Sequence, residues 1–301
     1  MKLLTLVSQE DKSKNYVIPT DDGGYFEARF VQRTDDYIIV YLSSHSGCDQ
    51  ACRFCHLTQT RQTMMQPADI LDYIAQAKRV LNDANLAQLK LFGLKKVKFS
   101  FMARGEPLLN PTILNKWDVL RRALKELVPP YFDVEFCIST IYPKKFEIEN
   151  RRLADIFNTP DVVIYYSVYS LNSDFRKTWL GNAADPKRAF EDLRTFSMAT
   201  NCRIKLHCSF IKDENDDLND IFALQCVLDR YLKGVKYKFN IVRYNPYSER
   251  QGEETDVENL RRIAGMLNAK VITRVGKDVK ASCGMFYNED INGTSYRNII
   301  G

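Results

Sequence analysis

Short apolar strand patterns alternate with helix patterns along most of this chain. Short strands separated by helices are typical of βαβ units that build a parallel sheet. About six such units are expected beyond residue 90, which favours an α/β fold with an open, partial (β/α)6 barrel. The expected strands cover residues 95–102, 134–139, 162–168, 203–211, 236–242 and 270–274, and the expected helices cover 68–81, 112–127, 145–157, 173–180, 186–199, 218–232 and 257–267.

The beginning of the chain has the pattern of a β-hairpin. Apolar segments separated by polar turns predict strands over residues 16–19, 25–32 and 37–44. We therefore expect a short N-terminal β extension over residues 1–44, followed by the barrel core over residues 45–301.

Composition suits one globular α/β protein. With 45% hydrophobic and 12% aromatic residues, the 301-residue chain can build a substantial core. No apolar run reaches the roughly 18 residues of a membrane span, and the apolar start is too short for a secretory signal. A cytoplasmic location without a membrane partner is therefore expected. The net charge of +5 permits a nucleic-acid partner without requiring one.

Three of the eight cysteines, Cys48, Cys52 and Cys55, lie within eight residues in a C-x3-C-x2-C pattern. Such crowding indicates a metal site, and a disulfide framework is not expected in a cytoplasmic chain. Most of the other cysteines lie in apolar segments and are expected to be small buried hydrophobic residues: Cys137, Cys202, Cys208 and Cys226.

Three thiolates can hold three irons of a [4Fe–4S] cluster, which leaves the fourth iron without a ligand from this stretch. An open iron is what a cluster needs if it must bind and reduce a substrate. The alternative is a Cys3His zinc knuckle that uses His56, although the adjacent Cys55 and His56 would chelate one tetrahedral ion poorly.

The cysteine segment resembles the radical SAM signature, including the aromatic Phe54 before the third cysteine. The resemblance implies that the amino and carboxylate groups of S-adenosylmethionine (SAM) chelate the fourth iron. It also implies that electron transfer from the cluster yields a 5′-deoxyadenosyl radical, with an external donor such as flavodoxin or ferredoxin.

A Gly105-Glu106-Pro107 sequence follows the expected strand 95–102. Glycine allows close backbone approach, and the carboxylate can accept hydrogen bonds from the SAM ammonium group. Alone, an ordinary loop would explain this sequence. With the Leu-Leu-Asn that follows it, however, the loop resembles the RlmN/Cfr family of RNA adenosine C2/C8 methyltransferases. That similarity extends from about Glu27 to Met285.

Other strand ends resemble the same family. Ser139-Thr140 matches a Ser-Thr, residues 167–169 (Ser-Val-Tyr) stand where the family usually has Ser-Leu-His, and residues 244–246 (Tyr-Asn-Pro) resemble Trp-Asn-Pro. Serine also commonly ends a strand, so a structural role for the two serines remains an alternative. The resemblance implies SAM contacts from Gly105, Glu106, Ser139, Ser167, Tyr169 and Asn245.

Residues 274–285 resemble the family loop that ends in Ala-Cys-Gly or Ser-Cys-Gly, which implies that Cys283 is catalytic. In the family, one SAM methylates this cysteine. The radical from a second SAM takes hydrogen from the S-methyl group, whose carbon adds to adenine. Arg274, Lys277 and Lys280 would favour the thiolate if they lie close to it. The alternative is a buried structural cysteine, against which the polar, glycine-flanked setting argues.

Glu27 matches the candidate general base of the family, and the alternative is a strand glutamate that faces solvent. Tyr41 stands seven residues before Cys48, where the family has the cysteine that resolves the protein–RNA thioether through a disulfide. A phenol cannot form one, although Cys137 or Cys208 could approach from a neighbouring strand. The helical accessory domain that precedes the family's hairpin also has no counterpart in this sequence.

Three functions are therefore weighed. The first is transfer of a SAM-derived methyl carbon through S-methyl-Cys283 to a nucleobase, adenine in RNA, by a monomeric enzyme. The second is the same machinery acting on a nucleotide, DNA base or small metabolite with another outcome. The third is a non-catalytic iron–sulfur or zinc protein that binds nucleic acid, which leaves the Gly-Glu-Pro loop and Cys283 without a purpose.

Overall fold

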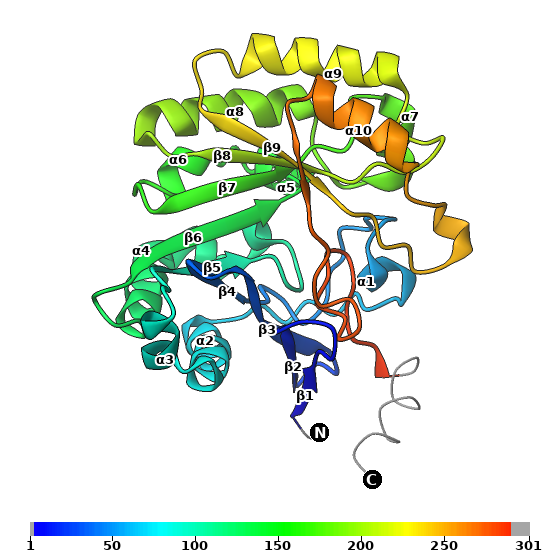
Figure 1. Ribbon diagram of the computed structural model, residues 1–301. Coiled ribbons are helices and arrows are strands. Elements are labelled where there is room, and N and C mark those ends of the chain that lie inside the picture. Colours follow the sequence, from blue (N-terminus) through cyan, green and yellow to red (C-terminus); the bar gives the residue numbers. More distant parts are fainter. Residues whose placement is uncertain (1–2, 290–301) are drawn as a thin grey trace.

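One ten-stranded sheet organises residues 3–289, which are the residues that the computed structural model describes (Figure 1). Its spatial order is the sequence order, antiparallel from β1 to β4 and parallel from β4 to β10. The strands are β1 (Leu4–Val7), β2 (Lys14–Pro19), β3 (Tyr25–Thr34), β4 (Tyr37–Tyr41), β5 (Lys96–Phe101), β6 (Asp133–Thr140), β7 (Val162–Ser167), β8 (Ile204–Cys208), β9 (Tyr237–Val242) and β10 (Lys270–Ile272).

Helices follow the parallel strands and pack on the outer side of the curved sheet (Figure 1). Alternate strand residues such as Val97, Phe99 and Phe136 join them in a continuous apolar core. The helical segments are α1 (His56–Gln59), α2 (Ile70–Ala84), α3 (Leu86–Leu91), α4 (Pro111–Glu126), α5 (Lys144–Ile148), α6 (Leu153–Ile156), α7 (Ser173–Trp179), α8 (Pro186–Thr200), α9 (Leu218–Tyr231) and α10 (Val257–Met266), with 3₁₀ turns η1 (Pro107–Leu109) and η2 (Glu249–Gln251).

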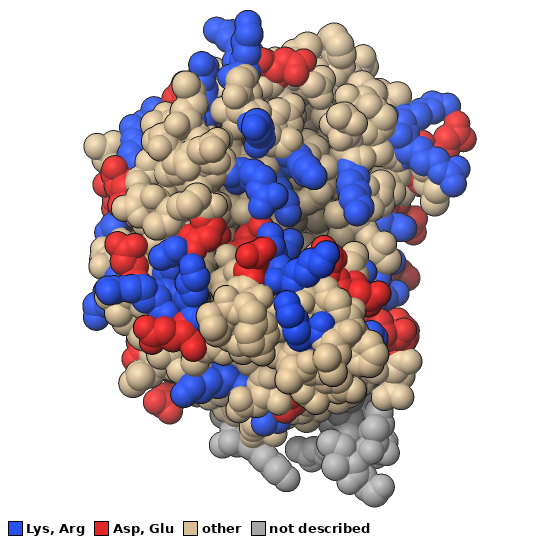
Figure 2. All heavy atoms as spheres, turned by 60° about the vertical axis from the view of Figure 1, so that its left-hand side comes forward, with Lys and Arg blue, Asp and Glu red and all other residues tan. Residues whose placement is uncertain are grey.

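The inner face of the same strands is polar. Glu135 on β6 forms ion pairs with Lys96 (3.6 Å), Lys98 (3.3 Å) and Arg203 (2.7 Å). Figure 2 shows a face on which Lys and Arg side chains gather across the middle of the molecule. One buried carboxylate therefore serves several cations, which leaves the inner face with an excess of positive charge.

The expected strands and most of the expected helices are confirmed, and so is the α/β partial-barrel class. One expected helix, 145–157, is instead two short helices, α5 and α6, because Asn150 between them adopts a left-handed φ of 52°. The strand expected over residues 37–44 ends at Tyr41 and pairs in parallel with β5, so it serves both the hairpin and the barrel.

Two further findings concern expectations from composition. Cys226 is exposed on α9, so its expected burial is wrong, whereas Cys137, Cys202 and Cys208 are buried as expected. Within residues 3–289, no helix combines the length and apolar character needed to cross a membrane.

Candidate active site

The three clustered cysteines lie on the loop between β4 and α1, at the carboxyl end of a parallel strand. The amide of Cys48 donates to the carbonyl of Gln62 (3.0 Å), and the amide of Cys55 donates to that of Cys52 (3.0 Å). A β-carbon on Gly47 would lie 2.4 Å from the Gln62 carbonyl, so only glycine fits there. These contacts fold the loop tightly enough for the three thiols to interact electrostatically with one another.

Burial raises the pKa of all three thiols, to about 11 for Cys55. Neighbouring thiols and Glu106 raise the pKa values of Cys48 and Cys52 further. Thiols in this setting are protonated unless a cation compensates the thiolate charge, so metal binding here would release protons. Glu106, from the loop after β5, therefore lies close enough to interact electrostatically with the thiols of the cysteine loop.

The donor set fits a cubane better than a single zinc ion. Among residues 3–289, no three His, Cys, Asp or Glu side chains gather closely enough to hold one ion, whereas a cubane spreads three thiolates over three irons. His56, the fourth ligand of the zinc alternative, instead has its Nε2 atom 3.1 Å from the Asn245 carbonyl.

The Gly-Glu-Pro loop forms a tight cradle beside this loop. Gly105 has φ +89°, and a β-carbon on it would lie 2.6 Å from both Ser44 Oγ and His45 Nδ1. The Glu106 carboxylate accepts hydrogen bonds from the amides of Leu108 (3.0 Å) and Ile141 (3.1 Å). Burial raises the pKa of Glu106 to about 7, against the lowering effect of these hydrogen bonds and of the Thr140 hydroxyl. A buried carboxyl whose pKa is raised toward neutrality is a candidate ligand-binding group.

The other expected SAM residues also lie at carboxyl ends of strands. Ser139 is the residue before the last of β6 and Ser167 is the last residue of β7, and both are partly buried. Tyr169 stacks on Phe54 of the cysteine loop, with ring centroids 4.2 Å apart. Asn245 donates from Nδ2 to the Cys283 carbonyl (3.0 Å), and its buried Oδ1 has no hydrogen-bond partner among the described residues. A buried unsatisfied oxygen is costly, so Asn245 Oδ1 fits the role of acceptor for a bound ligand.

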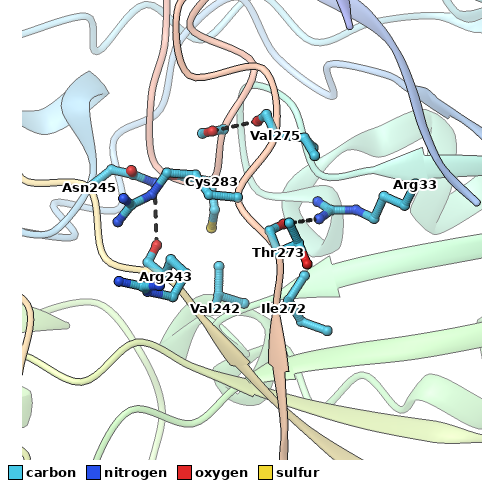
Figure 3. Close-up of a pocket in the computed structure, with 10 residues that line it drawn as sticks. Arg33, Val242, Arg243, Asn245, Ile272, Thr273, Val275 and Cys283 are labelled. Atoms are coloured by element: carbon cyan, nitrogen blue, oxygen red, sulfur yellow. Dashed lines mark hydrogen bonds between the residues drawn. The ribbon is translucent and has the colours of Figure 1, made fainter. Parts of the chain in front are cut away.

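Cys283 lies on the loop after β10, is exposed, and points its thiol into a small cavity (Figure 3). The loop is joined directly to the cysteine loop, because the His56 amide donates to the Gly284 carbonyl (2.9 Å). The Cys283 thiol also interacts electrostatically with Cys55 and Tyr169. The structure thus brings the expected catalytic cysteine to the expected cluster and SAM residues.

The cations around Cys283 differ from those expected. Desolvation by the surrounding atoms raises the pKa of the Cys283 thiol, and Arg29 and Arg33 of β3 oppose this rise. Of the three expected cations, Arg274 lines the cavity and donates to the Tyr244 carbonyl (2.7 Å). The neighbouring hairpin therefore supplies positive charge to the Cys283 thiol.

Glu27 is wholly buried, so the alternative of a solvent-facing strand glutamate is wrong. Its carboxylate forms ion pairs with Arg29 and Arg104, both at 2.8 Å, and accepts the Tyr287 amide (3.0 Å). Burial opposes ionisation, but the two guanidinium groups outweigh it and lower the pKa of Glu27. Its role as a general base stays a prediction, and in this geometry the carboxylate anchors the segment that follows Cys283.

Sequence reasoning missed Arg29, Arg33 and Arg104. One signal was present: opposite charges at positions 27 and 29 share one face of an otherwise apolar strand, which is typical of a buried ion pair. Arg104 and Arg33 gave no comparable local signal, because their partners come from distant segments.

Tyr41 of β4 pairs in register with Ser100 of β5, which in turn pairs in register with Cys137 of β6. The Cys137 thiol lies 3.7 Å from the Tyr165 hydroxyl, whereas the Cys208 thiol donates to the Tyr169 carbonyl (3.4 Å). The Tyr169 phenol interacts electrostatically with both Cys208 and Cys283. Of the two thiols considered as substitutes for a cysteine at position 41, Cys208 is therefore in the neighbourhood of Cys283.

Comparisons with known proteins identify distant relatives of this chain. No protein-family model matches the sequence. The chain is 24% identical over 298 residues to a probable dual-specificity RNA methyltransferase RlmN of Lachnospira eligens, covering 95% of this chain and 78% of that protein. It is 25% identical over 289 residues to the corresponding protein of Clostridioides difficile, covering 93% and 78%.

The fold matches a solved structure of a radical SAM methyltransferase from Sphaerobacter thermophilus. The TM-score is 0.69 at 20% identity, over 94% of this chain and 80% of that one. The mostly parallel sheet with N-terminal antiparallel hairpins is thus a radical SAM fold. The chain is a distant relative of the RlmN-like radical SAM methyltransferases over nearly its whole length. As a homologue of these methyltransferases, it is an enzyme.

Proposed function

We propose that this enzyme transfers a SAM-derived methyl carbon through Cys283 to a nucleobase, adenine in RNA. The observation that carries the proposal is the position of Cys283: its loop is hydrogen-bonded to His56, beside the cluster cysteines, and to Asn245. A thiol at this point adjoins both the proposed SAM site and a cavity that opens beside it.

In this proposal Cys48, Cys52 and Cys55 hold a [4Fe–4S] cluster, reduced by an external donor such as flavodoxin or ferredoxin. Bound together, the cluster and SAM supply a 5′-deoxyadenosyl radical. Glu106 supplies an acceptor for the SAM ammonium group, and the unpaired Asn245 Oδ1 supplies an acceptor for another polar group of SAM. Gly105 allows the ligand to approach the backbone closely. Ser139, Ser167 and Tyr169 complete the proposed SAM contacts.

Cys283 has two tasks. Its thiolate would accept the methyl group that bound SAM supplies: the thiol proton would pass to solvent, an S–CH₃ bond would form on Cys283, and S-adenosylhomocysteine would leave. Arg29 and Arg33 favour the thiolate needed for this transfer. Cys283 then presents the methyl carbon to a base in the adjoining cavity.

The mass of the Cys283 peptide tests this proposal. After anaerobic reconstitution with iron, sulfide and SAM, we expect a methyl group on Cys283 and none on Cys226, the other exposed cysteine. With a reductant, 5′-deoxyadenosine should form, and nucleoside analysis of treated RNA should show methyladenosine. An unmodified Cys283 in protein with an intact cluster would contradict the proposal.

Parallel treatment of DNA and free nucleotides decides the substrate. One outcome would separate the two parts of the proposal: 5′-deoxyadenosine forms and Cys283 is methylated, but only a nucleotide or DNA gains a methyl group. This result would support the radical chemistry and contradict RNA as the substrate. A Cys283→Ala variant should keep the cluster absorbance and lose methyl transfer by at least about 10³-fold, because it lacks the carbon carrier.

A further inference from the structure

The cavity beside Cys283 has an apolar floor and basic walls. Figure 3 shows the thiol pointing toward Val242, with Arg243 on one side and Arg33 on the other. Ile272 completes the floor, and Arg274 also lines the cavity. The arginines around this small cavity favour a negatively charged group at its rim.

The positive charges of two of these arginines are partly neutralised by a nearby carboxylate. Arg243 donates from Nε to Glu254 (2.7 Å) and makes a second contact with the same carboxylate. Arg274 lies 3.7 Å from Glu254 and also donates to the Tyr244 carbonyl. Glu254 therefore holds both side chains from outside the cavity and offsets part of their charge.

The positive charge of Arg33 has no carboxylate partner among the described residues. Within residues 3–289, no carboxylate lies within 4.0 Å of its guanidinium, and its one hydrogen bond joins Nη1 to the Thr273 carbonyl. No Asp or Glu is among the residues that line the cavity. The Thr273 contact fixes the guanidinium at the rim and leaves other N–H groups free, so Arg33 is a preset donor for an anion.

We propose that Arg33 binds a phosphate group of the substrate whose base reacts at Cys283. This inference rests on the proposed function and deepens it: Arg33 is the residue that recognises the phosphate of the reacting nucleotide unit, whether that unit is free or within a strand. A guanidinium matches phosphate geometry with two parallel hydrogen bonds. Every nucleotide unit carries a phosphate near its base, and phosphate contacts position a substrate without reading its sequence.

Protection of Cys283 from alkylation tests this directly. Cluster-loaded protein is treated with iodoacetamide in the presence of adenosine, adenosine 5′-monophosphate or inorganic phosphate, and the peptides are quantified by mass spectrometry. We expect the monophosphate to protect Cys283 at about tenfold lower concentration than adenosine, as one charge-assisted hydrogen-bonded contact provides. Cys226, exposed on α9, should be alkylated at an unchanged rate and serves as an internal control.

Variants assign the effect to Arg33. Arg33→Gln should remove the preference for the monophosphate, Arg33→Lys should keep part of it, and Arg262→Gln, on the exposed face of α10, should keep all of it. Equal protection of the wild-type protein by both compounds, including none by either, overturns the inference, and so does a preference that survives Arg33→Gln. The readout needs no methyl transfer, so failure of the proposed function would leave it interpretable.

Discussion

Single residues with opposite charges decide the conformation around Cys283. Glu27 is bound by Arg29 and Arg104 and by the amide of Tyr287, four residues beyond Cys283. Arg29 donates in turn to the Met285 carbonyl (2.8 Å). A buried carboxylate with this many partners is expensive to lose, since its removal leaves two guanidinium groups without compensation.

Glu27→Gln should lower the free energy of unfolding at pH 7 by about 3–5 kcal/mol, measured by urea denaturation. Glu258→Gln, which removes an exposed ion pair with Arg262, should change it by at most about 1 kcal/mol. Equal effects of the two substitutions would contradict the buried anchor.

The difference in stability between the wild-type protein and Glu27→Gln should depend on pH. The folded state lowers the pKa of Glu27 below its ordinary value of about 4.3. Its contribution is therefore complete above that value and declines as pH falls through the folded-state pKa. The difference in unfolding free energy between wild type and Glu27→Gln should narrow below about pH 4, and a constant difference would argue against an ionised Glu27.

At the level of elements, the strand and helix assignments could largely be predicted from the sequence. The periodicities are local, so segments such as β5 and α4 were apparent from short windows. The split between α5 and α6 was not, because it depends on the backbone conformation of Asn150. The cysteine loop and the Gly-Glu-Pro cradle have local motifs, whereas the Arg33–Thr273 contact joins residues 240 positions apart and has no such signal.

The loop after β5 needs glycine for two separable reasons. Gly105 and Gly23 both have positive φ, +89° and +82°, but only at Gly105 would a β-carbon meet neighbouring atoms. Gly23→Ala should cost about 1 kcal/mol of stability from backbone strain alone. Gly105→Ala should cost more and also weaken SAM binding, as measured by calorimetry on cluster-loaded protein. Equal costs and unchanged SAM affinity would show that the close approach at Gly105 is unimportant.

At the level of the whole molecule, Arg104 joins segments that are distant in the sequence. Its guanidinium donates to Glu27, to the Ser46 carbonyl (3.3 Å) before the cysteine loop, to Gln62 after it, and to the Tyr287 carbonyl. The proposed cluster loop and the Cys283 loop therefore share one buried side chain.

Arg104→Met should raise hydrogen–deuterium exchange in residues 46–62 and 281–287 together, because both segments lose the same partner. Arg121→Met, which breaks the ion pair between α4 and Asp161 at the amino end of β7, should raise exchange only near that pair. Changes confined to the neighbourhood of residue 104 would show that the two loops are independent.

The agreement between strand order and chain order also bears on biosynthesis. Each strand from β2 to β10 pairs with the strand made just before it, so the sheet can grow in the direction of translation without waiting for distant partners. Met285 and Tyr287 follow β10 in the chain, yet they contact Arg29 and Glu27 of β3, a strand that is made much earlier. A nascent chain would thus hold a nearly finished sheet before the Cys283 loop is made, and the proposed catalytic site would close only after β10 has been synthesised.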